Sequence, residues 1–321
     1  MPPKIKETMM DYGEILKRTW DITWRFKSLW LLGILASCGS GNGGGGGGGG
    51  NVTNGLQTPG GPGGNGELPQ IEQFFNSIDP AVWIILAIVI VLFFFFLALV
   101  AFVLGILGQA GLIHGFDQAD GGAVVNFVSA FKGGLPYFLR LFGLKLLLFV
   151  LSIVLIILLI ITILPFTVLT LGLGLICLLP LLCLLIPLGI ALNIYIQLTQ
   201  LSIVVEDVDI FAGFRKAWQV VKSDPGTIIV MALILLLGGG LIGLLLALPI
   251  IALIIPVVAG LGIGSDLSIG AGVGLAGLGF LLYLPILIVL SGILQTYIQG
   301  AWTLTYRRLT GRAGTPELAE A

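Results

Sequence analysis

The sequence predicts an all-α membrane protein with about six transmembrane helices, and three observations lead to this fold class. Of the 321 residues, 57% are hydrophobic and only 10% are charged, whereas a soluble domain carries about 25% charged residues. Charge-free runs long enough to cross a bilayer recur along the chain. All basic residues fall on one side of those runs. Soluble enzymes and nucleic-acid-binding proteins are therefore poor candidates, and the solvent for most of this apolar surface is lipid.

Four charge-free runs define the predicted spans, because a transmembrane helix needs about 20 apolar residues. The runs cover residues 80–116, 146–205, 225–265 and 267–306. The second run is long enough for two helices, and each of the others holds one. The predicted helices lie at residues 81–108, at either side of a turn near 165–174, at 227–257 and at 274–300. An earlier apolar segment, residues 28–37, is short for a span, so we expect five full spans and a sixth, short one.

The distribution of charge predicts the orientation of the chain. Six basic residues precede the first span, and three follow each of spans two, four and six, which accounts for all 15. The charged residues of the opposite loops are all acidic, namely Glu67, Glu72, Asp79 and Asp266. By the positive-inside rule both termini are expected in the cytoplasm. The expected location is the cell membrane, as a multi-pass protein of a prokaryotic plasma membrane.

A short motif recurs on the predicted cytoplasmic side. A bulky apolar residue, a small residue three positions on and then an aromatic residue occur as Leu16/Thr19/Trp20, Phe127/Ala130/Phe131 and Phe214/Ala217/Trp218. On a helix these positions share one face, so each copy predicts an amphipathic helix in the headgroup layer. We interpret the chain as one integral membrane domain of three repeats, residues 1–116, 117–205 and 206–321, each an interfacial helix with a membrane hairpin. The last repeat includes a short cytoplasmic tail. The alternative is convergent similarity.

Aromatic and basic side chains of these motifs are the predicted contacts with the membrane surface. They are Trp20, Arg18, Phe131, Lys132, Arg215 and Trp218. Aromatic rings sit at the boundary between headgroups and acyl chains, and basic groups attract anionic lipid. Membrane lipids are therefore the expected partners, and no nucleic acid is expected.

Two parts of the sequence resemble a known family. One is Phe214-Arg215-Lys216-Ala217-Trp218, which follows an acidic turn and runs into the span near Thr227. The other is the opening Asp11-Tyr12-Gly13-Glu14-Ile15-Leu16 with Trp30-Leu31-Leu32-Gly33-Ile34-Leu35-Ala36. Both resemble the membrane domain associated with some bacterial glycerophosphodiester phosphodiesterases and related polytopic proteins. The resemblance implies the repeated membrane fold but no activity, because no stretch is long and polar enough to form the catalytic barrel.

Residues 39–66 are rich in glycine and are expected to form a flexible external loop. Sixteen of these 28 residues are glycine, with eight in a row from Gly43 to Gly50, so little side-chain surface can be buried. Residues 28–38, just before this loop, rise only about 16 Å as a helix, which is too short to cross a hydrocarbon core of about 30 Å. The first span therefore has to be completed in one of two ways. Either residues 20–27 extend that helix, or glycine backbone continues at membrane depth beside a cavity.

Cys38 offers an alternative reading of the N-terminal region. With Leu35, Ala36 and Ser37 it fits a bacterial lipobox, and cleavage before it would leave a lipidated protein with five spans. The leader would then be 37 residues long and carry four acidic residues, whereas leaders usually have about 15–30 residues. The sequence is compatible both with a cleaved leader and with a retained first span.

Six amide side chains lie in the predicted spans, whose interiors hold no charge. They are Gln109, Asn193, Gln197, Gln200, Gln295 and Gln299. One interpretation is a polar cavity for a headgroup or small solute. The other, which the sequence favours, is that the amides form hydrogen bonds between helices, each worth about 0.6 kcal/mol.

Residues suited to catalysis or metal binding are sparse. His114 is the single histidine, and the three cysteines lack CxxC spacing, so no catalytic, cofactor or metal site is expected. Glu206, Asp207 and Asp209 are interpreted as a solvated turn and helix start. We expect a non-enzymatic protein that binds or senses lipid or organises the membrane. The alternative is a transporter or channel for a small polar solute or a lipid headgroup compound.

Overall fold

The computed structural model describes residues 11–39, 80–169, 174–263 and 266–312, and the elements found there are eight helices. Their bounds are α1 (Tyr12–Arg25), α2 (Ser28–Gly39), α4 (Pro80–Asp120), α5 (Phe127–Leu169), α6 (Gly174–Val205), α7 (Ile210–Ser223), α8 (Pro225–Ile263) and α9 (Asp266–Leu309). The long helices α4, α5, α6, α8 and α9 are each apolar and long enough to cross a membrane. The protein is thus an all-α polytopic membrane protein, as the sequence predicts.

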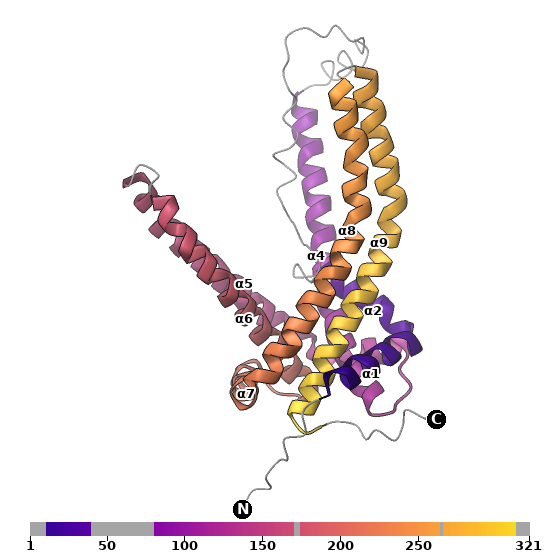
Figure 1. Ribbon diagram of the computed structural model, residues 1–321, viewed down its shortest axis with the longest axis vertical. Coiled ribbons are helices and arrows are strands. Elements are labelled where there is room, and N and C mark those ends of the chain that lie inside the picture. Colours follow the sequence, from indigo (N-terminus) through magenta and orange to yellow (C-terminus); the bar gives the residue numbers. More distant parts are fainter. Residues whose placement is uncertain (1–10, 40–79, 170–173, 264–265, 313–321) are drawn as a thin grey trace, which may run out of the picture.

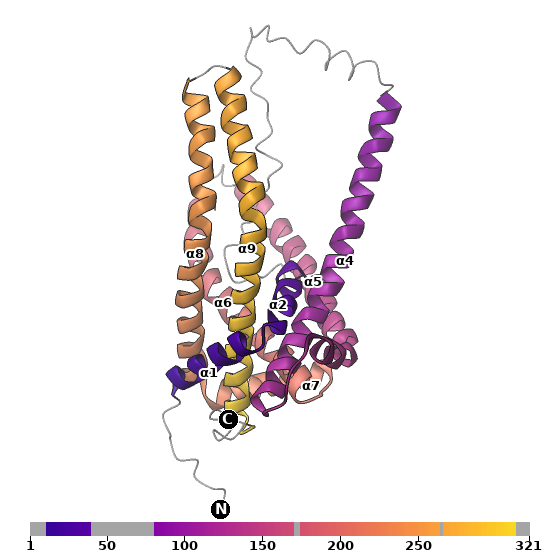
Figure 2. The same cartoon turned by 90° about the vertical axis from the view of Figure 1, so that its right-hand side faces the viewer.

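The five long helices converge at one end of the molecule and diverge at the other (Figures 1 and 2). The converging end, which also holds α1, α2 and α7, is called the base here, and the opposite end is called the spread end. The long helices contain 32 to 44 residues, which is about 48–66 Å at 1.5 Å per residue. A hydrocarbon core is only about 30 Å thick, so these helices are long enough to extend beyond it.

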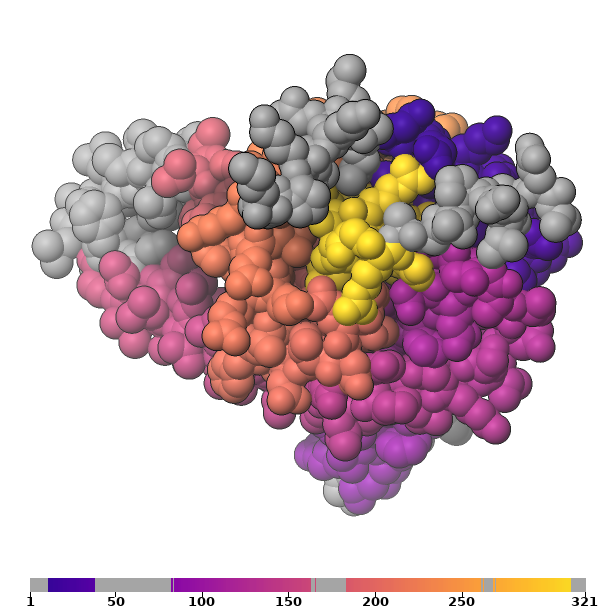
Figure 3. Space-filling model, turned by 90° about the horizontal axis from the view of Figure 1, so that it is seen from below, coloured from indigo at the N-terminus to yellow at the C-terminus, as the bar shows by residue number. Residues whose placement is uncertain are grey.

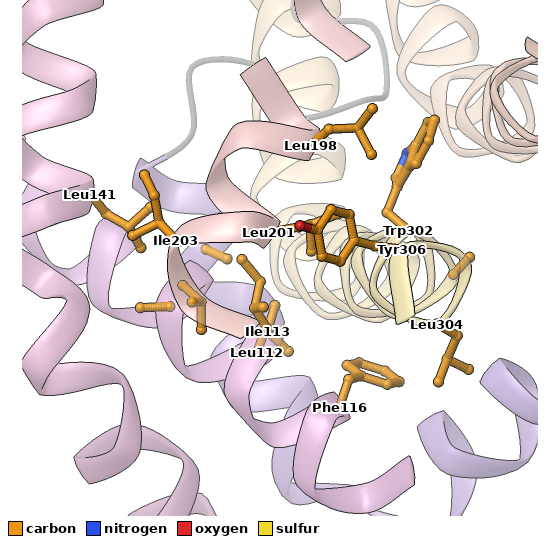
Figure 4. Close-up of a cluster of buried hydrophobic side chains, with 14 of the residues drawn as sticks. Leu112, Ile113, Phe116, Leu141, Leu198, Leu201, Ile203, Trp302, Leu304 and Tyr306 are labelled. Atoms are coloured by element: carbon orange, nitrogen blue, oxygen red, sulfur yellow. The ribbon is translucent and has the colours of Figure 1, made fainter. Parts of the chain in front are cut away.

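The buried core lies in the base (Figure 4). Helices α4, α6 and α9 supply most of its large side chains, among them Phe116, Leu201 and Tyr306, which are fully buried. At the spread end, by contrast, residues 84–100 of α4 and 183–192 of α6 are exposed throughout. Their side chains are apolar, so lipid is their natural solvent. The packing of side chains in the base therefore holds the helices together.

The short helix α2 packs in the base between α4 and α9. Glycines allow the close approach, since a Cβ added at Gly33 would lie 2.3 Å from the carbonyl oxygen of Gly292, and one at Gly108 would lie 2.7 Å from the nitrogen of Ala36. Leu29 and Leu32 are fully buried there, so the segment before Cys38 forms part of the core.

Helix α1 is separate from α2, so of the two ways of crossing the membrane, the one in which residues 20–27 extend the first span is not found. The chain leaves the helix at Phe26, and the indole Nε1 of Trp30 donates to the carbonyl oxygen of Thr23 at 2.8 Å. The reason is that α1 is amphipathic and buries Ile15 and Ile22 against the base. A continuous helix would carry its polar face into the membrane. Residues 40–66 of the predicted glycine-rich loop lie outside the described residues.

The second copy of the recurring motif is not a separate helix. Phe127 to Phe131 form the first turns of α5, whereas α1 and α7 are separate helices of 14 residues. At the junction of α7 and α8 a capping residue marks the break. Helix α7 gives way to α8 at Asp224, whose carboxylate accepts hydrogen bonds from the backbone nitrogen and hydroxyl of Thr227 at 3.2 and 2.6 Å, and no such residue follows Phe131. The division into three repeats stays a prediction.

Buried ion pairs tie α1, α4 and α9 together in the base. The Asp120 carboxylate is only 5% exposed and lies 2.7 Å from Nη2 of Arg18 and 3.1 Å from Nε of Arg307. Arg307 also lies 2.7 Å from the carboxylate of Asp117. Viewed from below, the C-terminal part of α9 lies between segments of α4 and α7 (Figure 3). The last turns of α9 therefore join the C-terminal helix to α1 and α4, near the start of the chain.

A second polar contact joins α6, α7 and α9, and it corrects the expectation for the acidic cluster. Asp207 and Asp209 are exposed, and Asp209 is the N-cap of α7. Glu206, however, is not solvated, because its side chain is only 5% exposed and is paired with Lys216. It also accepts a hydrogen bond from the hydroxyl of Tyr306 at 2.8 Å. Burial raises the pKa of Glu206, but Lys216, Tyr306 and Arg312 outweigh burial and lower the pKa below its ordinary 4.5.

We expect Asp120→Asn to lower the stability of the base strongly, because Arg18 and Arg307 would lose their shared counter-charge. Removing one partner of a buried ion pair costs about 3–5 kcal/mol. The measurement is the apparent Tm in detergent. Asp207→Asn is the matched control, since this carboxylate is 68% exposed in its pair with Arg140 and such a pair contributes about 0–1 kcal/mol. Equal Tm shifts for the two variants would contradict the assignment.

The contact at Glu206 predicts a pH dependence. Because its pKa is lowered on folding, the unfolded chain takes up the proton more readily, so the stabilisation is complete above the unfolded pKa and is lost as pH falls through the folded one. We expect the Tm difference between the native protein and Glu206→Gln to shrink between about pH 7 and about pH 3. A difference independent of pH would show that the carboxylate charge does not stabilise the base.

Candidate functional site

A cavity of about 1590 Å³ lies among α4, α5, α6, α8 and α9. Two arms of the molecule are the α5/α6 pair and the upright α8/α9 pair (Figure 1), and α4 stands apart from α8 and α9 at the spread end (Figure 2). All six amides of the predicted polar cavity are among its lining residues: Gln109, Asn193, Gln197, Gln200, Gln295 and Gln299. These side chains come from three helices that are far apart in sequence, and the fold brings them to a single cavity.

Each wall of the cavity is one stripe of a helix. On α5 most lining residues, among them Lys145, Leu148, Phe149 and Ser152, lie at the spacings i, i+3, i+4 and i+7 that share a helix face. Leu146 lines the cavity beside this stripe. On α4, Phe95, Leu99 and Phe102 line the cavity in the same way. Other faces of the same helices point to lipid or to the base. The cavity is thus built by helix periodicity and by the angle at which the two arms separate.

The polarity of the lining changes along the cavity. On α6, Leu185, Ile186 and Ile190 precede the amides Asn193, Gln197 and Gln200, which lie toward the base. On α4 the apolar stripe ends at Gln109, again toward the base. On α9, Gln295 and Gln299 lie on the part that runs into the base. The cavity therefore has an apolar end among the spread helices and a polar end above the buried core.

The amides at the polar end make hydrogen bonds across helices, but these bonds do not satisfy all of them. Nε2 of Gln109 donates to Oε1 of Gln200, and Nε2 of Gln197 donates to Oε1 of Gln299 at 2.5 Å. Oε1 of Gln109 and Nε2 of Gln299 are buried without a partner among the described residues. A buried unpaired polar group costs about 1–3 kcal/mol. One acceptor and one donor at the polar end are thus left without a protein partner among the described residues.

Lys145 is the charged residue of this site, and the sequence analysis missed it. It was counted among the basic residues beyond the membrane, but it lies within α5 and lines the cavity with the amides. Among the described residues, its ammonium forms no ion pair or hydrogen bond. A signal was available, because Lys145 lies 13 residues beyond Lys132, about 20 Å along a helix, and directly precedes the longest charge-free run.

Glycines widen the cavity at two places. Gly189 of α6 and Gly240 of α8 both line it, and a Cβ added at either would meet no atom within 4 Å. Gly238 also faces open space, but it is not among the lining residues. The glycines therefore leave room inside the cavity without being required for close packing of helices.

The predicted lipid-interface residues lie on the base, and the structure gives them different surroundings. Four of them are exposed: Trp20, Lys132, Arg215 and Trp218. Trp20 packs against Trp24 and Tyr297, and the ammonium of Lys222 lies 5.1 Å from the ring centre of Trp218. Phe131 stacks on Phe127. Arg18 differs, because it is engaged in the ion pair with Asp120.

Comparisons with known proteins returned no match to a family model, to a curated protein or to a solved structure. The resemblance to the membrane domain of bacterial glycerophosphodiester phosphodiesterases therefore remains an expectation, based on the motifs near Trp30 and Trp218.

Proposed function

We propose that this protein binds a membrane lipid in the cavity between its two arms, in a role that involves no catalysis. The observation that carries the proposal is the change in polarity along the cavity, from Phe95 and Leu185 at the spread end to Gln197 and Gln299 at the base. A lipid has the same two-part character. Its acyl chains would lie along the apolar walls and its headgroup would reach the amides.

The size and position of the cavity support a lipid rather than a small solute. Pockets for small molecules usually measure about 300–1,000 Å³, and this cavity of about 1590 Å³ is larger. Its polar end also coincides with the edge of the exposed apolar surface. That surface begins at Leu146 on α5 and ends near Leu192 on α6, directly beside Lys145 and Asn193. The headgroup would thus lie at the membrane boundary on the side of the base.

The exposed tryptophans and basic residues support placing the base at the cytoplasmic surface. Trp20 and Trp218 are each about half exposed, and aromatic side chains of this kind favour the interface between headgroups and acyl chains. With the one-sided distribution of basic residues, this orients the base and both termini toward the cytoplasm. The lipid would then come from the inner leaflet of the cell membrane.

A transporter or channel is the alternative, and the geometry supports it less. A solute leaving the amides toward the base would meet Trp302, which lines the cavity, and then the buried side chains of Leu304 and Tyr306 further along α9. These residues belong to the core shown in Figure 4. A transport path would have to open the packed base, whereas lipid binding needs no such movement.

Filling the cavity should reduce lipid binding. We expect Gly240→Leu to lower the amount of lipid retained by the protein in gentle detergent, because the new side chain would occupy cavity volume without colliding with the fold. Gly238→Leu is the matched control, since it adds the same side chain to the same helix outside the cavity. The measurement is native mass spectrometry. Equal retention by both variants and the native protein would refute binding in this cavity.

A further inference from the structure

We infer that the bound lipid carries an anionic phosphate headgroup, and that Lys145 is the residue that pairs with it. This inference rests on the proposed function and names the class of ligand. The lining residues of the cavity include one cation, Lys145, and no Asp or Glu. The site among the described residues thus has a net positive charge that no protein group balances.

Lys145 differs from the other basic residues of the described part because it is neither paired with a carboxylate nor exposed. Arg18, Arg140, Lys216, Arg307 and Arg308 each form an ion pair with a carboxylate. The described basic residues that form no ion pair, such as Lys27, Lys132 and Arg215, are otherwise exposed, whereas Lys145 is part-buried within the apolar helix α5. A charge placed in a bilayer costs about 2.5–3.5 kcal/mol on insertion scales, and such residues normally have a counter-charge or a functional role. Here the counter-charge has to come from outside the described protein.

The location of Lys145 fits a lipid phosphate. Leu144 before it is fully buried, whereas Leu146 and Leu147 after it are exposed and apolar. Its ammonium therefore emerges where the lipid-facing surface of α5 begins. The phosphates of a bilayer lie at this boundary, and a lipid with its chains between the arms would bring its phosphate to the same level. An ammonium binds phosphate oxygens through charge-assisted hydrogen bonds.

The unpaired amide atoms complete the recognition of a headgroup. Nε2 of Gln299 is a buried donor without a partner among the described residues, and a rotation of this side chain toward the cavity would offer it to a phosphate oxygen. Asn193 and Gln295 line the same cavity and make no side-chain hydrogen bonds among the described residues. The buried acceptor, Oε1 of Gln109, suits a hydroxyl group. A quaternary ammonium headgroup offers no such donor and would place a positive charge in a site that already holds Lys145. The chemistry therefore favours an anionic glycerophospholipid over a zwitterionic choline lipid.

The test compares two lipids with identical acyl chains on the full-length protein. Native mass spectrometry would follow the binding of phosphatidylglycerol and phosphatidylcholine to the delipidated protein. We expect a preference of about tenfold for phosphatidylglycerol, equivalent to about 1.4 kcal/mol. Lys145→Met should abolish this preference and Lys145→Arg should keep it. Lys27→Gln is the control, because it removes a lysine from the exposed turn between α1 and α2.

The outcomes separate the headgroup inference from the proposed function. If lipid binds and Gly240→Leu reduces it, but the native protein shows no preference or Lys145→Met keeps it, the headgroup inference fails and lipid binding stands. If neither lipid binds above the level of Gly240→Leu, the proposed function fails. A final arm adds inorganic phosphate as a competitor. If phosphate displaces phosphatidylglycerol from the native protein at concentrations that displace none from Lys145→Met, that result would assign the site to free phosphate and overturn the lipid assignment.

Discussion

Arg307 and Asp120 form the contact on which the arrangement of the helices depends. Their ion pair is buried near the ends of α4 and α9, and Arg18 joins it from α1. Further along α4 and α9 toward the spread end, α2 is wedged between these two helices through the glycines at positions 33, 108 and 292. In water an apolar core would drive such packing. In a bilayer that driving force is weak, because lipid chains are as apolar as leucine, so close packing and polar contacts hold the helices together in the base.

The cavity is a consequence of this arrangement. Helices joined only at one end have no reason to close at the other, where lipid solvates their apolar side chains equally well. The α5/α6 pair accordingly stands away from α8 and α9 (Figure 1), and the space between the arms is lined by one stripe from each helix. Where the arms meet, the amides and Lys145 are brought together. The cavity is thus apolar where the helices diverge and polar where they converge.

The amide side chains show that a structural and a functional interpretation are compatible. Two of the hydrogen bonds, from Gln109 to Gln200 and from Gln197 to Gln299, link the helices as the simpler interpretation expects. Within the described part of the chain, each pair nevertheless leaves one buried atom unpaired. A side-chain amide has both a donor group and an acceptor group, so using one for packing leaves the other for a ligand.

Hydropathy and charge by themselves determined the fold class, the five long spans and the amides as candidates, because the cost of burying charge in lipid acts on each segment separately. The end of α1 at Arg25 and the continuity of Phe127 with α5 depended on packing and capping, which local periodicity does not encode. Glu206 was misread as solvated because its partners, Lys216 and Tyr306, come from other helices. For the same reason only the tertiary structure could place Lys145 in the same cavity as Gln200. Which residues meet across helices is decided by crossing angles and close contacts between segments far apart in the chain.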